Sequence, residues 1–279
     1  MLCPKGALRV KPGLNSLKIA LEEVKQSRLC KAEDLSVNTN VNARFKTNGA
    51  YNPGKISKMN KDGTYDITFD DGENRKNTPF TEIEVRGIEE IYLENGVHMF
   101  EVNQNQNYVN INISITVIGE SRLNCKIIGG FNIQGKKEDN VNIHNVTVSE
   151  SMHDGVTGGI QSASIHLDNV SVENSGSRGV IVYGSKRNTM KNCNVSHSKH
   201  SGLGVFNGGL MTIDGNDTTI HHNGTDYDDY GLCASSTASI HLVSPLTKEM
   251  ISKNNGGGGN HGGHGTIKTM TNNTKEAKK

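Results

Sequence analysis

The chain contains no tryptophan, and aromatic residues make up only 5% of its 279 residues. Hydrophobic residues account for 33%, and proline is scarce with five residues, whereas glycine is abundant with 32. A compact helical globule buries more leucine and aromatic mass than this to offset the loss of chain entropy. A solenoid needs less, because each coil buries only a thin line of aliphatic side chains against its neighbours. The composition therefore favours a repeat architecture.

An excess of charge of either sign is also lacking, since 30 basic residues balance 29 acidic ones. This balance argues against nucleic acid or an anionic membrane as a general partner. No segment approaches the roughly 18 apolar residues that span a bilayer. The N-terminal segment MLCPKGALRVKPG has no apolar signal-peptide core. We therefore expect an intracellular protein, in the cytoplasm or nucleus, without nucleic-acid or membrane partners.

The cysteines follow no C-x-x-C spacing and are odd in number. They are Cys3, Cys30, Cys125, Cys193 and Cys233. In a chain without an export signal, this pattern indicates reduced thiols that act mostly as small buried hydrophobes.

An internal repeat is visible in three segments: NVTVSESMHDGV from Asn145, NVSVENSGSRGV from Asn169 and NCNVSHSKHSGL from Asn192. A looser fourth copy starts at Asn216. Short alternating strands separated by Gly, Asn and Ser turns, repeating about every 24 residues, predict coils of about three strands each. Leucine-rich repeats would need recurring leucines and a helical segment, and a propeller blade would need about 40 residues or more. The repeat therefore predicts a mainly β parallel β-helix.

The segments IYLENGVHMFEV and ITVIGES, followed by these repeats, resemble right-handed parallel β-helix proteins of the pectin-lyase-like superfamily. The resemblance implies an amphipathic N-terminal helix that caps the first coil, and SLKIALEEVKQ fits that role. Ser16 is positioned to cap this helix, whose residues Leu17, Ala20, Leu21 and Val24 share one face. The alternative is an independent amphipathic helix that binds a partner.

Residues 43–86 lack the repeat. Strand-like runs broken by turn signals at Asp62-Gly63 and Asp71-Gly72 predict five short antiparallel strands in a small SH3-like barrel. The predicted layout is an N-terminal segment 1–42 with a helix at about 16–27, the barrel at 43–86, the β-helix at 87–272 and a disordered tail at 273–279.

The phrases DGTYDI and DDG together resemble Tudor-type domains. The resemblance implies binding of methylated Lys or Arg in an aromatic cage, where π faces attract a desolvated cation. Matching positions give Tyr51, Tyr65 and Phe69 as cage candidates and Asp71 as a charge partner. Alternatively, Tyr65 and Phe69 simply fill the core of a small barrel.

Catalysis by the β-helix would need two carboxylates supplied by adjacent coils. The candidates are Asp226, Asp228 and Asp229 in the segment TDYDDY, with His153-Asp154 and Asp168 upstream. A lyase would add Arg or Lys as base, yet Arg178 and Lys186 show no sequence pairing with these carboxylates. The alternative is that TDYDDY is a solvated loop.

His261 and His264 are the candidate metal ligands, together with the adjacent pair His221-His222, although the glycine-rich flanks of the first two disfavour a preorganised site. We expect no cofactor. The leading hypothesis is a non-enzymatic binding or scaffold protein, in which the barrel binds a peptide or methylated residue and the β-helix offers a surface to protein or glycan. The rival is a carbohydrate-active lyase or hydrolase.

Overall fold

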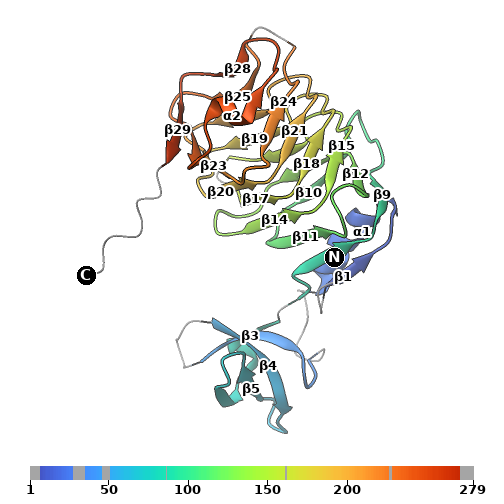
Figure 1. Cartoon of the computed structure of the whole chain (residues 1–279). Helices are drawn as coiled ribbons and strands as arrows, with labels where there is room; N and C mark the ends of the chain where they lie inside the picture. Colours follow the sequence, from blue (N-terminus) through green and yellow to red (C-terminus); the bar gives the residue numbers. More distant parts are fainter. Residues whose placement is uncertain are drawn as a thin grey trace, which may run out of the picture. The chain divides into compact units, whose positions relative to one another are not determined.

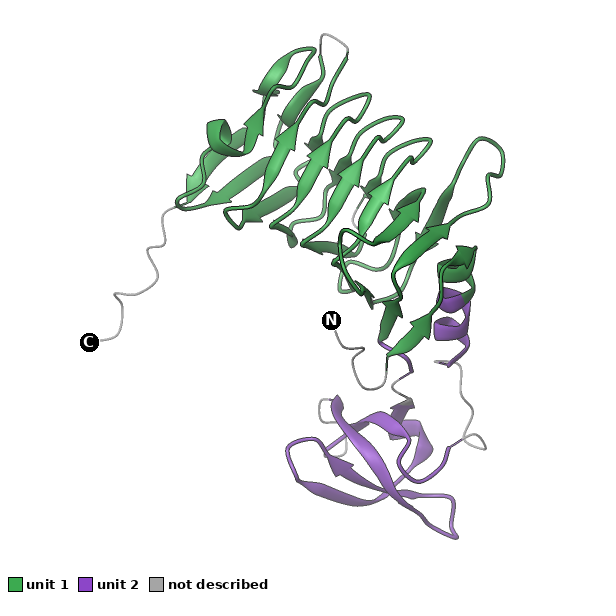
Figure 2. Cartoon of the chain, turned by 45° about the vertical axis from the view of Figure 1, so that its right-hand side comes forward, with its two compact units in different colours: residues 1–19, 90–279 green, residues 20–89 purple. Residues whose placement is uncertain are grey.

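The computed structural model describes residues 7–27, 35–45, 51–85, 87–160, 162–225 and 228–270. The chain divides into two compact units, one made of residues 1–19 with 90–279 and the other of residues 20–89. Figure 2 colours them separately. We call the first of these the β-helix unit. The name small β unit refers to the antiparallel strands of the second, within residues 35–85. The expected tail at 273–279 lies outside the described residues.

The β-helix unit consists of three parallel sheets, which successive strands visit in turn (Figure 1). Within the described residues, the first sheet has nine strands: β1 (Leu8–Val10), β8 (Glu90–Leu93), β11 (Ile115–Gly119), β14 (Asn140–His144), β17 (Ser164–Asp168), β20 (Asn188–Lys191), β23 (Leu210–Asp214), β26 (Ser239–Val243) and β29 (Thr266–Met270). The second sheet comprises β2 (Gly13–Leu14), β9 (Gly96–Met99), β12 (Cys125–Ile128), β15 (Thr147–Ser149), β18 (Ser171–Glu173), β21 (Asn194–Ser196), β24 (Thr219–His221) and β27 (Ser252–Lys253). The third sheet comprises β10 (Tyr108–Ile111), β13 (Gly130–Ile133), β16 (Val156–Gly158), β19 (Val180–Tyr183), β22 (Leu203–Phe206), β25 (Tyr230–Ala234) and β28 (Gly259–Gly262). A short helix, α2 (Lys248–Ile251), lies between β26 and β27 and begins at the Thr247 cap.

Register within the sheets follows the repeat seen in the sequence. In the third sheet Val156 pairs with Val180, and Val180 pairs with Leu203. These are the apolar residues of the aligned Gly-Val and Gly-Leu pairs. The prediction of a parallel β-helix is confirmed, with each coil stacked in register on the one before it.

The core runs through the middle of the coils as three columns of mostly aliphatic side chains, one for each sheet. The columns are continuous because alternate residues of each strand point inward. Residues in these columns are at most 1% exposed, and they include Ile143, Leu167, Met190 and Ile213 from the first sheet, Val148, Val172, Val195 and Ile220 from the second, and Phe131, Val156, Val180 and Leu203 from the third. Burying each such side chain contributes roughly 1.5–3 kcal/mol.

The corner between the first and second sheets is built from residues in the left-handed conformation. Asn145, Asn169 and Asn192 have φ values of 55°, 53° and 50°. The side-chain amide of Asn169 donates to Oδ1 of Asn145 at 2.8 Å, across a sequence separation of 24 residues. In the next coil this position is held by Gly215, with φ 81°. The predicted fourth repeat start at Asn216 is therefore displaced by one residue.

Replacing Asn169 by alanine tests this corner. Asn169→Ala removes the ladder hydrogen bond and places at positive φ an alanine, which tolerates the left-handed conformation less well than asparagine does. We therefore expect it to lower the free energy of unfolding by about 2 kcal/mol. Asn169→Gly keeps the backbone conformation accessible and should lose about 1 kcal/mol. Denaturant unfolding followed by circular dichroism measures both. Equal losses for the two variants would contradict a contribution from the left-handed backbone.

The N-terminal end of the β-helix differs from the expectation. Strands β1 and β2 precede the helix and pair with β8 and β9, so within the described residues the first strand of the solenoid starts at Leu8. The helix α1 (Ser16–Ser27) is present, and Leu17, Ala20, Leu21 and Val24 are all buried. Ser16 is not the cap, because it is the first helical residue and its hydroxyl donates to Nδ1 of His98 at 2.9 Å.

His98 holds the start of α1 to the second sheet. Its side chain is fully buried, and Nε2 donates to the carbonyl oxygen of Glu94 at 2.9 Å, which leaves Nδ1 as the acceptor for Ser16. Burial lowers the pKa of His98 below its ordinary value of 6.5. The neutral imidazole is thus the form that the folded state requires.

Acidification should therefore destabilise the β-helix unit. The unfolded chain takes up a proton on His98 near pH 6.5, whereas the folded chain does so only at lower pH, so stability present above pH 6.5 is lost as the pH falls. We expect His98→Gln, which can both donate and accept, to show a shallower loss of denaturation midpoint between pH 7 and pH 5 than the unmodified chain. Burial also lowers the pKa of His166, His221 and His241, so part of the dependence of the denaturation midpoint on pH remains in His98→Gln. His264→Gln, at an exposed turn, serves as the control. If the denaturation midpoint of His98→Gln fell with pH as steeply as that of the unmodified chain, the role given to neutral His98 would be refuted.

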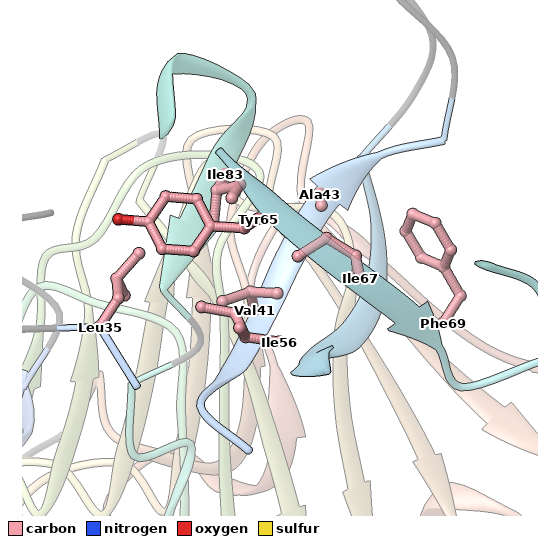
Figure 3. Close-up of a cluster of buried hydrophobic side chains, with 8 residues drawn as sticks. All are labelled: Leu35, Val41, Ala43, Ile56, Tyr65, Ile67, Phe69 and Ile83. Carbon is pink, nitrogen blue, oxygen red and sulfur yellow. The ribbon is translucent and has the colours of Figure 1, made fainter. Parts of the chain in front are cut away.

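The small β unit is a five-stranded antiparallel sheet in the order β6-β5-β4-β3-β7. Its strands are β3 (Asn40–Arg44), β4 (Tyr51–Met59), β5 (Tyr65–Phe69), β6 (Asn74–Thr78) and β7 (Ile83–Val85), with a 3-10 turn η2 (Phe80–Glu82) before β7. Figure 3 shows its core of Leu35, Val41, Ala43, Ile56, Tyr65, Ile67, Phe69 and Ile83. The expected turn signals are in place, since Gly63 and Gly72 have φ values of 80° and 91°.

Candidate functional site

Two of the proposed cage aromatics belong to the core of the small β unit. Tyr65 and Phe69 are 5% and 3% exposed because strand β5 alternates, and Tyr65, Ile67 and Phe69 all point to its buried face. Figure 3 places Tyr65 beside Leu35 and Phe69 at the other end of the cluster. Phe45, which sequence reasoning missed, packs its ring edge against Phe69 at 5.4 Å between centroids. The aromatic rings therefore pack inward rather than around an open cage.

Tyr51 is the cage candidate that remains at the surface of the unit. Its ring is half-buried, and the guanidinium of Arg44 on the paired strand lies 5.1 Å from the ring centroid. The tyrosine face is thus already in contact with a cation of the chain itself. Asp71 is exposed in the turn between β5 and β6, where its Oδ1 accepts the main-chain N–H of Glu73 at 3.0 Å.

The candidate carboxylates of the β-helix unit are only partly brought together. Asp226 lies outside the described residues, and Asp228 is exposed. Asp229 is 7% exposed, and its Oδ2 lies 2.9 Å from Nδ1 of His200. His200 belongs to the preceding coil, and sequence reasoning missed it. The signal was available in the repeat, because His153 and His200 both stand two residues before the glycine that directly precedes a strand of the third sheet.

Asp154 and Arg178 occupy the same corner in earlier coils. Oδ1 of Asp154 accepts the main-chain N–H of Arg178 at 2.9 Å, and the Arg178 guanidinium lies 5.5 Å from the ring centroid of Phe206. A cleft of about 280 Å³ runs beside Asp154 on the outer face of the third sheet, lined by Gln106, Tyr108, Phe131, Asn132, His153, Asp154, Thr157 and Ser177. The corner thus presents two histidines, two carboxylates and one arginine in stacked coils.

Asp168 lies elsewhere, at the end of β17 on the first sheet. Its Oδ2 is 3.9 Å from Nδ1 of His144, and both residues line a separate cleft of about 450 Å³. Asp168 ends a strand of the first sheet, whereas Asp229 directly precedes β25 of the third sheet, so the two do not form one carboxylate pair. Lys186 also lies away from both, in the connection that leads from the third sheet to the first.

The histidines do not converge as a metal centre. His261 on β28 has Nε2 3.9 Å from a carboxylate oxygen of Glu249, and His264 is exposed in the turn before β29. In the described ranges, no group of three or more His, Cys, Asp or Glu residues is arranged to hold a metal ion.

A different trio of histidines lies at the corner that follows the second sheet. His197 and His222 are nearly parallel, with ring centroids 5.3 Å apart. Nδ1 of His221 and Nδ1 of His222 are 2.7 Å apart. Burial, with the neighbouring imidazoles, lowers the pKa of His221. The trio is a stacked, hydrogen-bonded group.

Three cysteines are free and buried, namely Cys125, Cys193 and Cys233. Burial raises the pKa of Cys125 to about 12 and that of Cys193 to about 11, and it also raises the pKa of Cys233. These thiols remain protonated at neutral pH and are poor nucleophiles. Cys3 and Cys30 lie outside the described residues.

Comparison with known families agrees with this architecture. Residues 129–276, more than half of the chain, match the family model described as the right handed beta helix region, and the chain belongs to that family. The right-handed β-helix prediction is thereby confirmed, and the family description concerns the fold alone. No curated protein and no solved structure matches the chain. No helix among the described residues is long and apolar enough to cross a membrane.

Proposed function

We propose that this chain is a non-enzymatic binding protein whose small β unit is a Tudor/SH3-like barrel inserted, in chain order, between α1 and strand β8. Five antiparallel strands around a separate hydrophobic core support this assignment. The DGTYDI and DDG phrases, which form the two tight turns flanking β5, also support it. The barrel would recognise a peptide, and the β-helix unit would offer an interaction surface to protein or glycan.

The contact between Arg44 and Tyr51 carries the proposal of a cationic peptide ligand. A tyrosine face attracts a guanidinium or a methylated ammonium through its ring quadrupole, and here the chain places its own guanidinium 5.1 Å from that face. A methylated Lys or Arg of the ligand would replace Arg44 over Tyr51. Since Tyr65 and Phe69 are in the core, the binding face would consist of Tyr51 with a neighbouring acidic turn.

That acidic turn lies close to the start of β4. The main-chain N–H of Asp70 donates to the carbonyl oxygen of Pro53 at 2.9 Å, and Gly54 pairs with Phe69. Asp71 directly follows Asp70, and Tyr51 lies two residues before Pro53. Asp71 is therefore next to the start of β4, where Tyr51 lies. Its carboxylate would add a charge contact for the bound cation.

Binding of trimethyl-lysine and dimethyl-arginine peptides to the full chain, followed by fluorescence anisotropy, tests this proposal. We expect Tyr51→Ala to weaken binding at least about tenfold, because a cation–π contact desolvated on binding is worth roughly 2 kcal/mol. Arg44→Ala should strengthen binding, since it removes the internal competitor. Tyr51→Phe, which keeps the ring, is the matched control. Unchanged affinity in Tyr51→Ala, or weaker binding in Arg44→Ala, would contradict the proposal.

A second candidate function, a carbohydrate-active enzyme, is favoured by the His200 and Asp229 pair. Asp229 accepts from Nδ1 of His200 when that nitrogen is protonated, which would leave Nε2 to accept a proton from substrate. The nearby Arg178 would contact an anionic saccharide.

Incubation with polyuronides and Ca²⁺, followed by ultraviolet absorbance of unsaturated products or by assay of reducing ends, distinguishes the two functions. On the binding proposal we expect no turnover by the unmodified chain. Turnover that is lost in His200→Gln or Asp229→Asn, with the fold retained by circular dichroism, would replace the binding proposal by the enzyme. The exposed Asp228→Ala reports whether the neighbouring carboxylate contributes.

A further inference from the structure

A basic cavity lies where the chain passes from the third sheet to the first. It has a volume of about 340 Å³ and is lined by Lys137, Ser162, Gly184, Ser185, Lys186 and Arg187. These residues come from three successive connections: β13 to β14, β16 to β17, and β19 to β20. Because the coils are in register, the same corner stacks on itself and brings together residues about two coils apart in sequence.

The lining of this cavity carries only positive charge. Within the described part of the chain, Lys137, Lys186 and Arg187 form no ion pair, and the described lining contains no carboxylate. The nearest acidic residues in these connections are Glu138, which is exposed, and Asp139. Asp139 is already engaged, since its carboxylate accepts from the Ser114 hydroxyl at 2.8 Å and from the main-chain N–H of Lys136 at 2.8 Å.

Arg187 and the turn that carries it are fixed in place. One terminal nitrogen of Arg187, Nη2, donates to the carbonyl oxygens of Lys137 and Asp139, at 2.6 and 3.3 Å. The buried amide of Asn188 donates to the carbonyl oxygens of Ser185 and Leu210, at 2.8 and 2.9 Å. The cation is therefore held by its own scaffold before any ligand arrives, which reduces the loss of side-chain entropy on binding.

Hydrogen-bond donors accompany the charges. The main-chain N–H groups of Lys186 and Arg187 make no hydrogen bond within the described residues. Among the described residues, the only hydrogen bond that the Ser185 hydroxyl donates is a long one, 3.4 Å, to Oδ1 of Asn188. A guanidinium, two ammonium groups and a serine hydroxyl are the donors that recognise a tetrahedral oxyanion.

We propose that this cavity binds the phosphoryl or sulfuryl group of a small polar molecule. Its volume lies at the lower end of the range for small-molecule sites, about 300–1,000 Å³. It thus has room for a group of monosaccharide size attached to the anion. The cavity lies wholly within the β-helix unit, so the inference is independent of peptide binding by the small β unit.

Isothermal titration calorimetry of the full chain at low salt tests the inference. The probes are inorganic phosphate, inorganic sulfate, glucose 6-phosphate and, as the neutral comparison, glucose. We expect the anions to bind and glucose not to bind, with affinity falling as salt is raised. Tighter binding of glucose 6-phosphate than of phosphate identifies a phosphate ester as the ligand, whereas equal binding identifies the free anion, and either result supports the site.

Three variants locate the binding. Arg187→Gln, Lys186→Gln and Lys137→Gln should each weaken glucose 6-phosphate binding at least about tenfold, because a charge-assisted hydrogen bond is lost in each. Lys199→Gln, which also removes an exposed charge but at a different corner, is the matched control and should bind normally. Thermal unfolding confirms that each variant is folded, and the two lysine variants remain informative if Arg187→Gln unfolds. No binding of any anion at millimolar concentration, or equal weakening in Lys199→Gln, would overturn the proposal.

Discussion

Each coil of the β-helix unit buries its aliphatic side chains within the coil and against the coils directly before and after it. The parallel backbone ladder holds those coils in register, and a shift of one residue would turn every inward valine and isoleucine toward solvent. All other features of this unit depend on that register. It explains why the turns favour asparagine and glycine, since a corner that recurs at the same place in every coil needs the same left-handed backbone conformation each time.

Register also determines how side chains of distant sequence position meet. In a solenoid, residues one coil apart lie side by side, so a functional group is assembled by repetition of a corner rather than by a long-range fold. Asp154 with Arg178 and His200 with Asp229 are two such pairs at the corner that leads into the third sheet. The connections that leave the third sheet gather Lys137, Lys186 and Arg187 instead. The two corners therefore have different chemistry on the same framework.

The small β unit is governed by a different constraint, the size of its core. Eight buried residues form the core cluster of this five-stranded sheet, and a sheet this small cannot leave its large aromatic side chains at the surface without losing much of its hydrophobic stabilisation. Tyr65 and Phe69 accordingly complete the core, while Tyr51, at the start of a strand, is only half-buried and contacts Arg44. The alternation along β5 decided this division, because it places Tyr65, Ile67 and Phe69 on one side.

The repeat of about 24 residues was sufficient to predict the β-helix, and the helical spacing of apolar residues after Ser16 was sufficient to predict the amphipathic helix, because both are encoded by local periodicity in hydrophobicity. Periodicity could not reveal β1 and β2, which are too short to show a pattern and are strands only because β8 and β9 pair with them. It also misplaced the fourth corner by one residue, because Gly215 takes the left-handed conformation there and not the adjacent Asn216 that resembles the asparagines of the other coils. Composition and motif identified carboxylates and aromatic residues as candidates. Only the tertiary structure decided which of them meet, because the partners of Asp229, Tyr51 and Arg187 come from other coils or strands and the distance between them depends on stacking register rather than on sequence separation.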